Sequence, residues 1–150
     1  MCLLIFVASD TPLPIVEDDP DLPLFSTRLV DEETQPITRW FSKPHIMELT
    51  YGGCGCGFYY SESDLDPLSQ GDVPDDVKAN AKRVYEESVA MVNRLAAYIA
   101  DASKSSFAEV YCCWDGDWEV EPESRQAVGL DYFGGPSFHF EEGQLLTVSP

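Results

Sequence analysis

Basic side chains are scarce in this sequence. Its 150 residues contain 9 Lys and Arg against 27 Asp and Glu, which gives a formal net charge of −18. Nucleic acids and anionic membranes attract proteins through basic side chains, so this balance argues against both as direct ligands. A basic protein or a small cationic ligand is the partner that such a charge favours. The same charge also keeps a protein soluble without any partner.

Long apolar runs are missing as well. The run nearest the N-terminus, residues 2–8, is too short to cross a bilayer and follows no basic leader. We therefore expect a buried strand there, with neither a signal peptide nor a membrane span. Five cysteines in a chain without a secretory leader are expected to stay reduced or to bind metal, which favours the cytoplasm.

One segment has a clear helical period. Apolar side chains recur every three or four residues from Val77 to Tyr98. Pro74 and the two aspartates after it predict the start of this helix, and we expect the helix to end between residues 102 and 105. At 1.5 Å per residue it would be roughly 40 Å long.

Strands are expected over most of the remaining chain. Alternation and turn residues predict them at 3–7, 24–30, 37–41, 46–51, 58–60, 107–114, 117–121, 126–130, 138–140 and 145–148. Asp115-Gly116 and Glu142-Gly143 predict two hairpins. The length suits one domain, residues 1–150. We expect an α+β fold, a mostly antiparallel sheet of about six strands with one long helix packed across one face.

The most informative motif is Gly52-Gly53-Cys54-Gly55-Cys56-Gly57. Structural zinc sites use four Cys or His ligands, whose thiolates lie under about 4 Å apart. In an extended strand Cys54 and Cys56 would be roughly 6.6 Å apart. Zinc binding through Cys54 and Cys56 therefore requires that the glycines curl the backbone. Cys112 and Cys113 would point to opposite faces of a strand, so at most one of them could join such a site.

Three other interpretations of the thiols are open. Narrowly spaced thiols can form an easily reduced disulfide, although acidic surroundings raise thiol pKa values and argue against a redox pair. A cysteine enzyme would need His45 or His139, and neither has a recognisable catalytic context. The simplest interpretation is packing, in which small residues lie where the helix crosses the sheet. We assign no catalytic residue, and no cofactor apart from the zinc alternative.

The predicted strand 117–121 supplies a candidate binding surface. Alternation places its acidic side chains on one face and its apolar side chains on the other. Tryptophan is enriched at interaction hot spots. We therefore expect a non-catalytic binding module for a basic protein or a small ligand, with a surface made by Trp114, Trp118, Glu119 and Glu121.

The first sixty residues resemble a group of uncharacterised bacterial proteins. The similarity lies in Met1-Cys2, in Ile5 to Asp10 with Pro12-Leu13-Pro14, in Phe41 to Pro44 and in Gly53 to Phe58. The resemblance implies a bacterial cytoplasmic origin and carries no activity.

Overall fold

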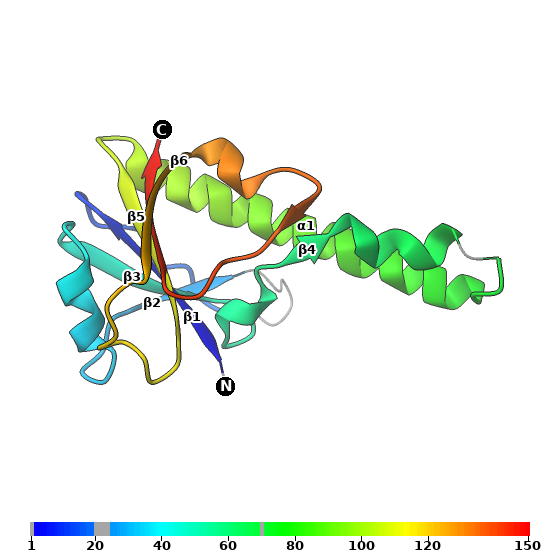
Figure 1. Cartoon of the computed structure of the whole chain (residues 1–150), viewed down its shortest axis with the longest axis horizontal. Helices are drawn as coiled ribbons and strands as arrows, with labels where there is room; N and C mark the ends of the chain where they lie inside the picture. Colours follow the sequence, from blue (N-terminus) through cyan, green and yellow to red (C-terminus); the bar gives the residue numbers. More distant parts are fainter. Residues whose placement is uncertain (1, 20–24, 70) are drawn as a thin grey trace.

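A six-stranded sheet forms the centre of the molecule (Figure 1). The computed structural model describes residues 2–19, 25–69 and 71–150. The sheet order is β2-β3-β1-β5-β8-β6, and all neighbours are antiparallel except β6 and β8. Its strands are β1 (Leu3–Ser9), β2 (Ser26–Leu29), β3 (His45–Thr50), β5 (Ala108–Trp114), β6 (Ser124–Gly129) and β8 (Gln144–Ser149). One long helix, α1 (Asp75–Ser103), packs on one face, so the predicted α+β fold is confirmed.

The remaining elements are short. Strands β4 (Tyr60–Ser61) and β7 (Ser137–Phe138) pair to form a separate two-stranded sheet. The described residues also form the 3-10 helices η1 (Gln35–Trp40), η2 (Gly55–Gly57), η3 (Glu62–Ser69) and η4 (Leu130–Phe133). No helix in the described ranges is long and apolar enough to cross a membrane.

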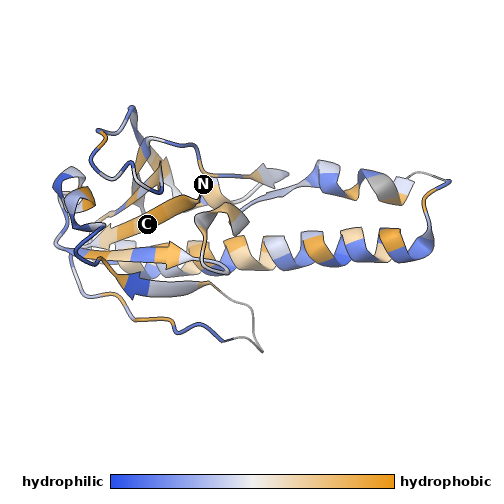
Figure 2. Cartoon of the chain, turned by 90° about the horizontal axis from the view of Figure 1, so that it is seen from below, coloured by the Kyte–Doolittle hydropathy of each residue, from blue (hydrophilic) through white to orange (hydrophobic). Residues whose placement is uncertain are grey.

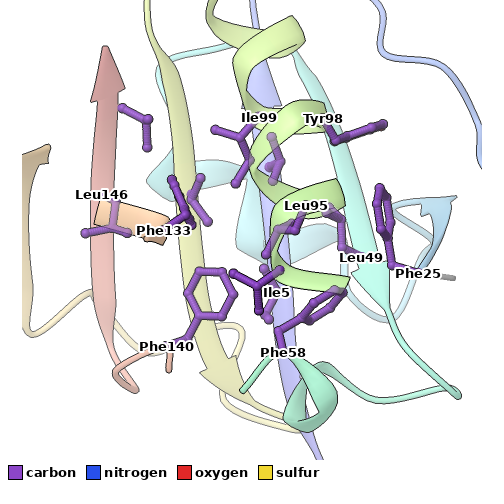
Figure 3. Close-up of a cluster of buried hydrophobic side chains, with 14 of the residues drawn as sticks. Ile5, Phe25, Leu49, Phe58, Leu95, Tyr98, Ile99, Phe133, Phe140 and Leu146 are labelled. Atoms are coloured by element: carbon purple, nitrogen blue, oxygen red, sulfur yellow. The ribbon is translucent and has the colours of Figure 1, made fainter. Parts of the chain in front are cut away.

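Strand β1 lies at the centre of the core and is buried on both faces. Ile5 and Val7 face α1, where Leu95 and Ile99 point toward the sheet (Figure 3). Leu4 and Phe6 face a second cluster that is closed by Ile37 of η1. Burial of this kind contributes about 1.5–3 kcal/mol for each large apolar side chain.

The fully buried side chains of α1 all lie in its second half. Its buried side chains begin at Met91 and continue to Ser103. The first half of α1 extends beyond the sheet and runs beside η3. Together these two segments form an arm that projects from the rest of the molecule (Figures 1 and 2). The helix is thus longer than the face that it covers.

Two predicted strands and one predicted hairpin have another structure. Residues 37–41 fall largely in η1, because Pro36 at its start fixes a helical φ and lacks the N–H that a sheet ladder needs. Residues 117–121 form turns instead of a return strand. The second predicted hairpin is also wrong, because β7 pairs with β4 whereas β8 pairs with β5 and β6.

Ionic contacts fix the sheet edge and its loops. Glu48 of β3 has a side chain that is 1% exposed and an Oε1 atom 2.7 Å from Arg28 Nη2. Its Oε2 atom has no hydrogen-bond partner among the described residues. Lys43 lies 2.7 Å from Asp10 and over the ring of Phe107, which ties the loop before β3 to the end of β1.

Candidate functional site

A tight turn brings the glycine–cysteine segment back along the end of β3. Tyr51 and Cys54 form a two-residue hairpin, with Tyr51 N–H donating to Cys54 O at 2.8 Å and Cys54 N–H donating to Tyr51 O at 3.3 Å. Gly52 and Gly53 between them have φ angles of 61° and 82°, which side chains with a Cβ rarely adopt. The glycine pair therefore permits the turn that places Cys54.

The next turn, η2, brings the two thiols together. Cys54 is extended and precedes η2, and its sulfur accepts a hydrogen bond from Cys56 N–H at 3.3 Å. The Sγ atoms of Cys54 and Cys56 then lie 2.8 Å apart in a thiol–thiol hydrogen bond. From the sequence, Cys54 and Cys56 could bind one ligand only if the glycines curled the backbone between them. The structure shows this curl.

Gly55 allows η2 to lie directly against β1. A Cβ built on Gly55 would be 2.7 Å from the carbonyl oxygen of Leu3 and 2.9 Å from Cγ1 of Ile5. The predicted close approach is therefore real, but the neighbour is β1 and not the long helix. Cys54 is half-buried and Cys56 is exposed, so the packing interpretation does not fit these two thiols.

The start of β1 adds a third thiol to the pair. Leu3 N–H donates to Cys56 Sγ at 3.3 Å, and the Cys54 thiol donates to Leu3 O at 3.7 Å. Cys2 precedes Leu3, and its thiol interacts with Cys54. We call Cys2, Cys54 and Cys56 the thiol cluster.

Hydrogen bonds within the thiol cluster make its members unequal. Burial raises the pKa of Cys54, but hydrogen bonds from Cys56 and Cys2 outweigh burial and hold that pKa below its ordinary value. The hydrogen bond to Cys54 raises the pKa of Cys2 and of Cys56. Cys54 therefore ionises first. The expectation that acidic surroundings would raise the thiol pKa is wrong for Cys54.

The other two cysteines are packing residues. Cys112 lies in the cluster under α1 and Cys113 lies in the cluster on the opposite face, as their adjacency in a strand predicts. Burial raises the pKa of Cys112 and raises the pKa of Cys113 to about 12. Both thiols therefore stay protonated at neutral pH.

Metal ligation in its usual form is not found at the thiol cluster. Within the part of the chain that the structure describes, no three or more His, Cys, Asp or Glu side chains are grouped so as to hold a metal ion. His139 is exposed between the buried Phe138 and Phe140, as alternation predicts. His45 lies at the start of β3, which pairs with the opposite end of β1 from the thiols.

The predicted acidic and aromatic surface lies on turns that follow β5. Trp118 packs partly into the second core cluster, and its carbonyl accepts a hydrogen bond from Trp40 Nε1 at 3.2 Å. Glu119 is 70% exposed and 3.9 Å from Arg39. Glu121 is exposed, whereas Trp114 is half-buried at the end of β5 and pairs with Leu3. The strand alternation on which the surface was predicted is absent.

One apolar cavity lies away from the thiol cluster. It measures about 310 Å³ and is lined by Pro12, Leu13, Leu29, Val30, Thr38, Pro44, His45, Ile46 and Met47. Ligand sites need a few convergent polar groups besides apolar walls. Only Thr38 and His45 offer polar side chains here, so the thiol cluster is the stronger candidate.

Comparison with known proteins adds no assignment. No family model, no curated protein and no solved structure matches the chain.

Cys2 is the site residue that sequence reasoning missed. Its contact with Cys54 spans more than fifty positions and depends on where η2 crosses β1. The sequence places Cys2 directly before the most apolar predicted strand, but this position does not indicate which residue Cys2 contacts.

Proposed function

We propose that this protein performs thiol–disulfide exchange through Cys54 and Cys56. The observation that carries the proposal is the 2.8 Å separation of their sulfurs at an accessible position. Two thiols so placed need only a small movement to reach the bond length of about 2.05 Å that a disulfide requires. The lowered pKa of Cys54 supports its role as the attacking thiolate.

The reaction proceeds in two steps. The Cys54 thiolate attacks one sulfur of a substrate disulfide, which forms a mixed disulfide and releases the other substrate sulfur as a thiolate. Cys56 then loses its proton to solvent and attacks Cys54 Sγ, which releases the second substrate thiolate. Solvent protonates both leaving thiolates. The protein dithiol has lost two electrons, and the substrate disulfide has gained them.

A neutral disulfide probe tests the proposal. Reduced protein is mixed with bis(2-hydroxyethyl) disulfide, quenched with acid and analysed by intact mass. We expect rapid loss of two hydrogens and a Cys54–Cys56 disulfide in the peptide map. Cys54→Ser should react much more slowly, whereas Cys113→Ser, at a buried position, should react like the unaltered protein. Equal rates for Cys54→Ser and the unaltered protein would refute the proposal.

Binding of a basic protein is a second candidate function. It is favoured by the rigidity of the acidic turn 115–121, because Trp40 Nε1 and Tyr111 Oη bind the carbonyls of Trp118 and Val120. A turn held in this way loses little conformational freedom when a partner docks. The net charge of −18 would speed the approach of a cationic partner.

Charge variants test this surface. Binding to a lysine-rich peptide is measured by titration calorimetry at low and high salt. The double variant Glu119→Gln/Glu121→Gln should weaken binding, and the double variant Glu86→Gln/Glu87→Gln on the exposed side of α1 removes the same charge elsewhere. An equal loss in both double variants would show that only net charge matters and that no surface exists at 115–121.

A further inference from the structure

We propose that Cys2 is a second resolving thiol, so that Cys54 can form either of two disulfides, with Cys56 or with Cys2. The inference rests on the exchange chemistry proposed above. It assigns a chemical role to the third member of the thiol cluster.

Geometry carries this assignment. The backbone of Leu3 binds both sulfurs of the pair, with N–H to Cys56 Sγ at 3.3 Å and with O to Cys54 Sγ at 3.7 Å. Cys2 is joined directly to Leu3, and the carbonyl of Cys2 is held by Asp115 N–H at 2.8 Å. This anchored backbone places Cys2 next to the residue that contacts both sulfurs, and the Cys2 thiol interacts with Cys54. Cys2 and Cys56 thus reach the same sulfur from two different segments.

The chemistry is the same as in the second step above. In a mixed disulfide on Cys54, the Cys2 thiol loses its proton to solvent and attacks Cys54 Sγ, and the substrate thiolate leaves. From a Cys54–Cys56 disulfide, the same attack forms the Cys2–Cys54 bond and releases Cys56 as a thiolate, which takes up a proton. This second reaction exchanges bonds and needs no oxidant.

The two disulfides differ in the length of chain that they close. A Cys54–Cys56 bond closes a loop of 3 residues, and a Cys2–Cys54 bond closes a loop of 53 residues. The dependence of chain entropy on loop length makes unfolding roughly 70-fold less favourable for the longer link than for the shorter one. The Cys2–Cys54 form should therefore resist unfolding more than the Cys54–Cys56 form, and it would join η2 covalently to the central strand of the sheet.

Three variants and the same neutral disulfide test the role of Cys2. We expect Cys2→Ser to close to Cys54–Cys56, and Cys56→Ser to close to Cys2–Cys54. The double variant Cys2→Ser/Cys56→Ser should stop as a mercaptoethanol adduct on Cys54. If Cys56→Ser also stops as an adduct while Cys2→Ser closes, exchange stands and the role of Cys2 is refuted. If Cys2→Ser fails to close, the exchange proposal itself fails.

The unaltered protein gives a readout that needs no substitution. Peptide maps are taken over time after addition of one equivalent of oxidant. We expect both the Cys54–Cys56 link and the Cys2–Cys54 link in the maps, with a higher midpoint of thermal unfolding for the protein that carries the Cys2–Cys54 link. A map that contains only Cys54–Cys56 at all times would overturn the inference.

Discussion

Substitution of Gly55 tests the contact that shapes the thiol cluster. In Gly55→Ala, the new Cβ would lie 2.7 Å from the carbonyl oxygen of Leu3, and this atom belongs to the backbone of the central strand. Because backbone cannot rotate aside as a side chain can, η2 must move off β1. Overpacking of this kind costs about 1–3 kcal/mol, and we expect about 2 kcal/mol here.

Two other glycines separate the clash from general effects of added Cβ atoms. Gly71→Ala meets no atom within 4 Å and should change the free energy of unfolding by less than about 0.5 kcal/mol. Gly52→Ala also meets open space, but its φ of 61° should cost about 1 kcal/mol of backbone strain.

Urea denaturation and thermal unfolding measure these differences. A loss of about 2 kcal/mol lowers the unfolding midpoint of a protein of this size by about 4–8 °C. Gly55→Ala should also slow closure of the Cys54–Cys56 disulfide, because η2 no longer sets the two sulfurs side by side. If Gly55→Ala is as stable as Gly71→Ala, the close approach of η2 to β1 is wrong.

Four further predictions concern charge, pH, thiols and metal. Arg28→Ala should lower the free energy of unfolding by about 1–2 kcal/mol, because it leaves the buried Glu48 carboxylate without its cation; Arg83→Ala, which breaks an exposed helical pair with Glu87, should cost only about 0.3–0.5 kcal/mol in the same urea titration. Burial raises the pKa of Tyr111 from 10.0 to about 12, so between these pH values the folded protein keeps the phenol neutral while the unfolded chain ionises it. The free energy of unfolding should therefore fall as the pH rises from 10.0 to about 12. Tyr111→Phe should flatten this fall, and an unchanged pH slope in that variant would refute the prediction. Iodoacetamide should alkylate Cys54 at a lower pH than Cys2 or Cys56 and should leave Cys112 and Cys113 unmodified in the native protein, as peptide mass mapping would show. Protein purified without chelator should have the mass of the bare chain in native spectra, whereas a zinc ion lost on denaturation would make Cys54 and Cys56 zinc ligands instead.

Local sequence signals predict the elements whose own pattern decides them. The helix was expected from Pro74 to residues 102–105, and it spans Asp75–Ser103, because its period and its acidic first turn are both local. The strands near residues 3–7, 46–51 and 107–114 follow from apolar runs and alternation, and the structure places β1, β3 and β5 there.

Long-range contacts decide the parts that sequence patterns missed. The Asp115-Gly116 signal predicts a turn correctly, but residues 117–121 do not return along β5. Their carbonyls bind Trp40 and Tyr111, and β8 takes the place beside β5. The local pattern of residues 117–121 gives no information about these distant contacts or about the pairing of β8 with β5.

At the candidate site, too, local sequence patterns predict some features and long-range contacts decide the others. The spacing of Cys54 and Cys56 and their flanking glycines indicate the turn, since only a curled backbone can bring such thiols together. The lowered pKa of Cys54 and the part of Cys2 depend on contacts with β1, which is distant in sequence. Neither follows from a local sequence pattern.

Redox titration of the unaltered protein tests the central claim most directly. The protein is equilibrated in buffers of graded dithiothreitol poise, trapped with acid and mapped for disulfides. The account predicts a single two-electron transition, in which the ratio of oxidised to reduced protein changes tenfold for each change of about 30 mV in potential. Cys54 should be part of every disulfide that forms. If Cys54 stays reduced at every poise, or if disulfides form without it, the exchange site does not exist.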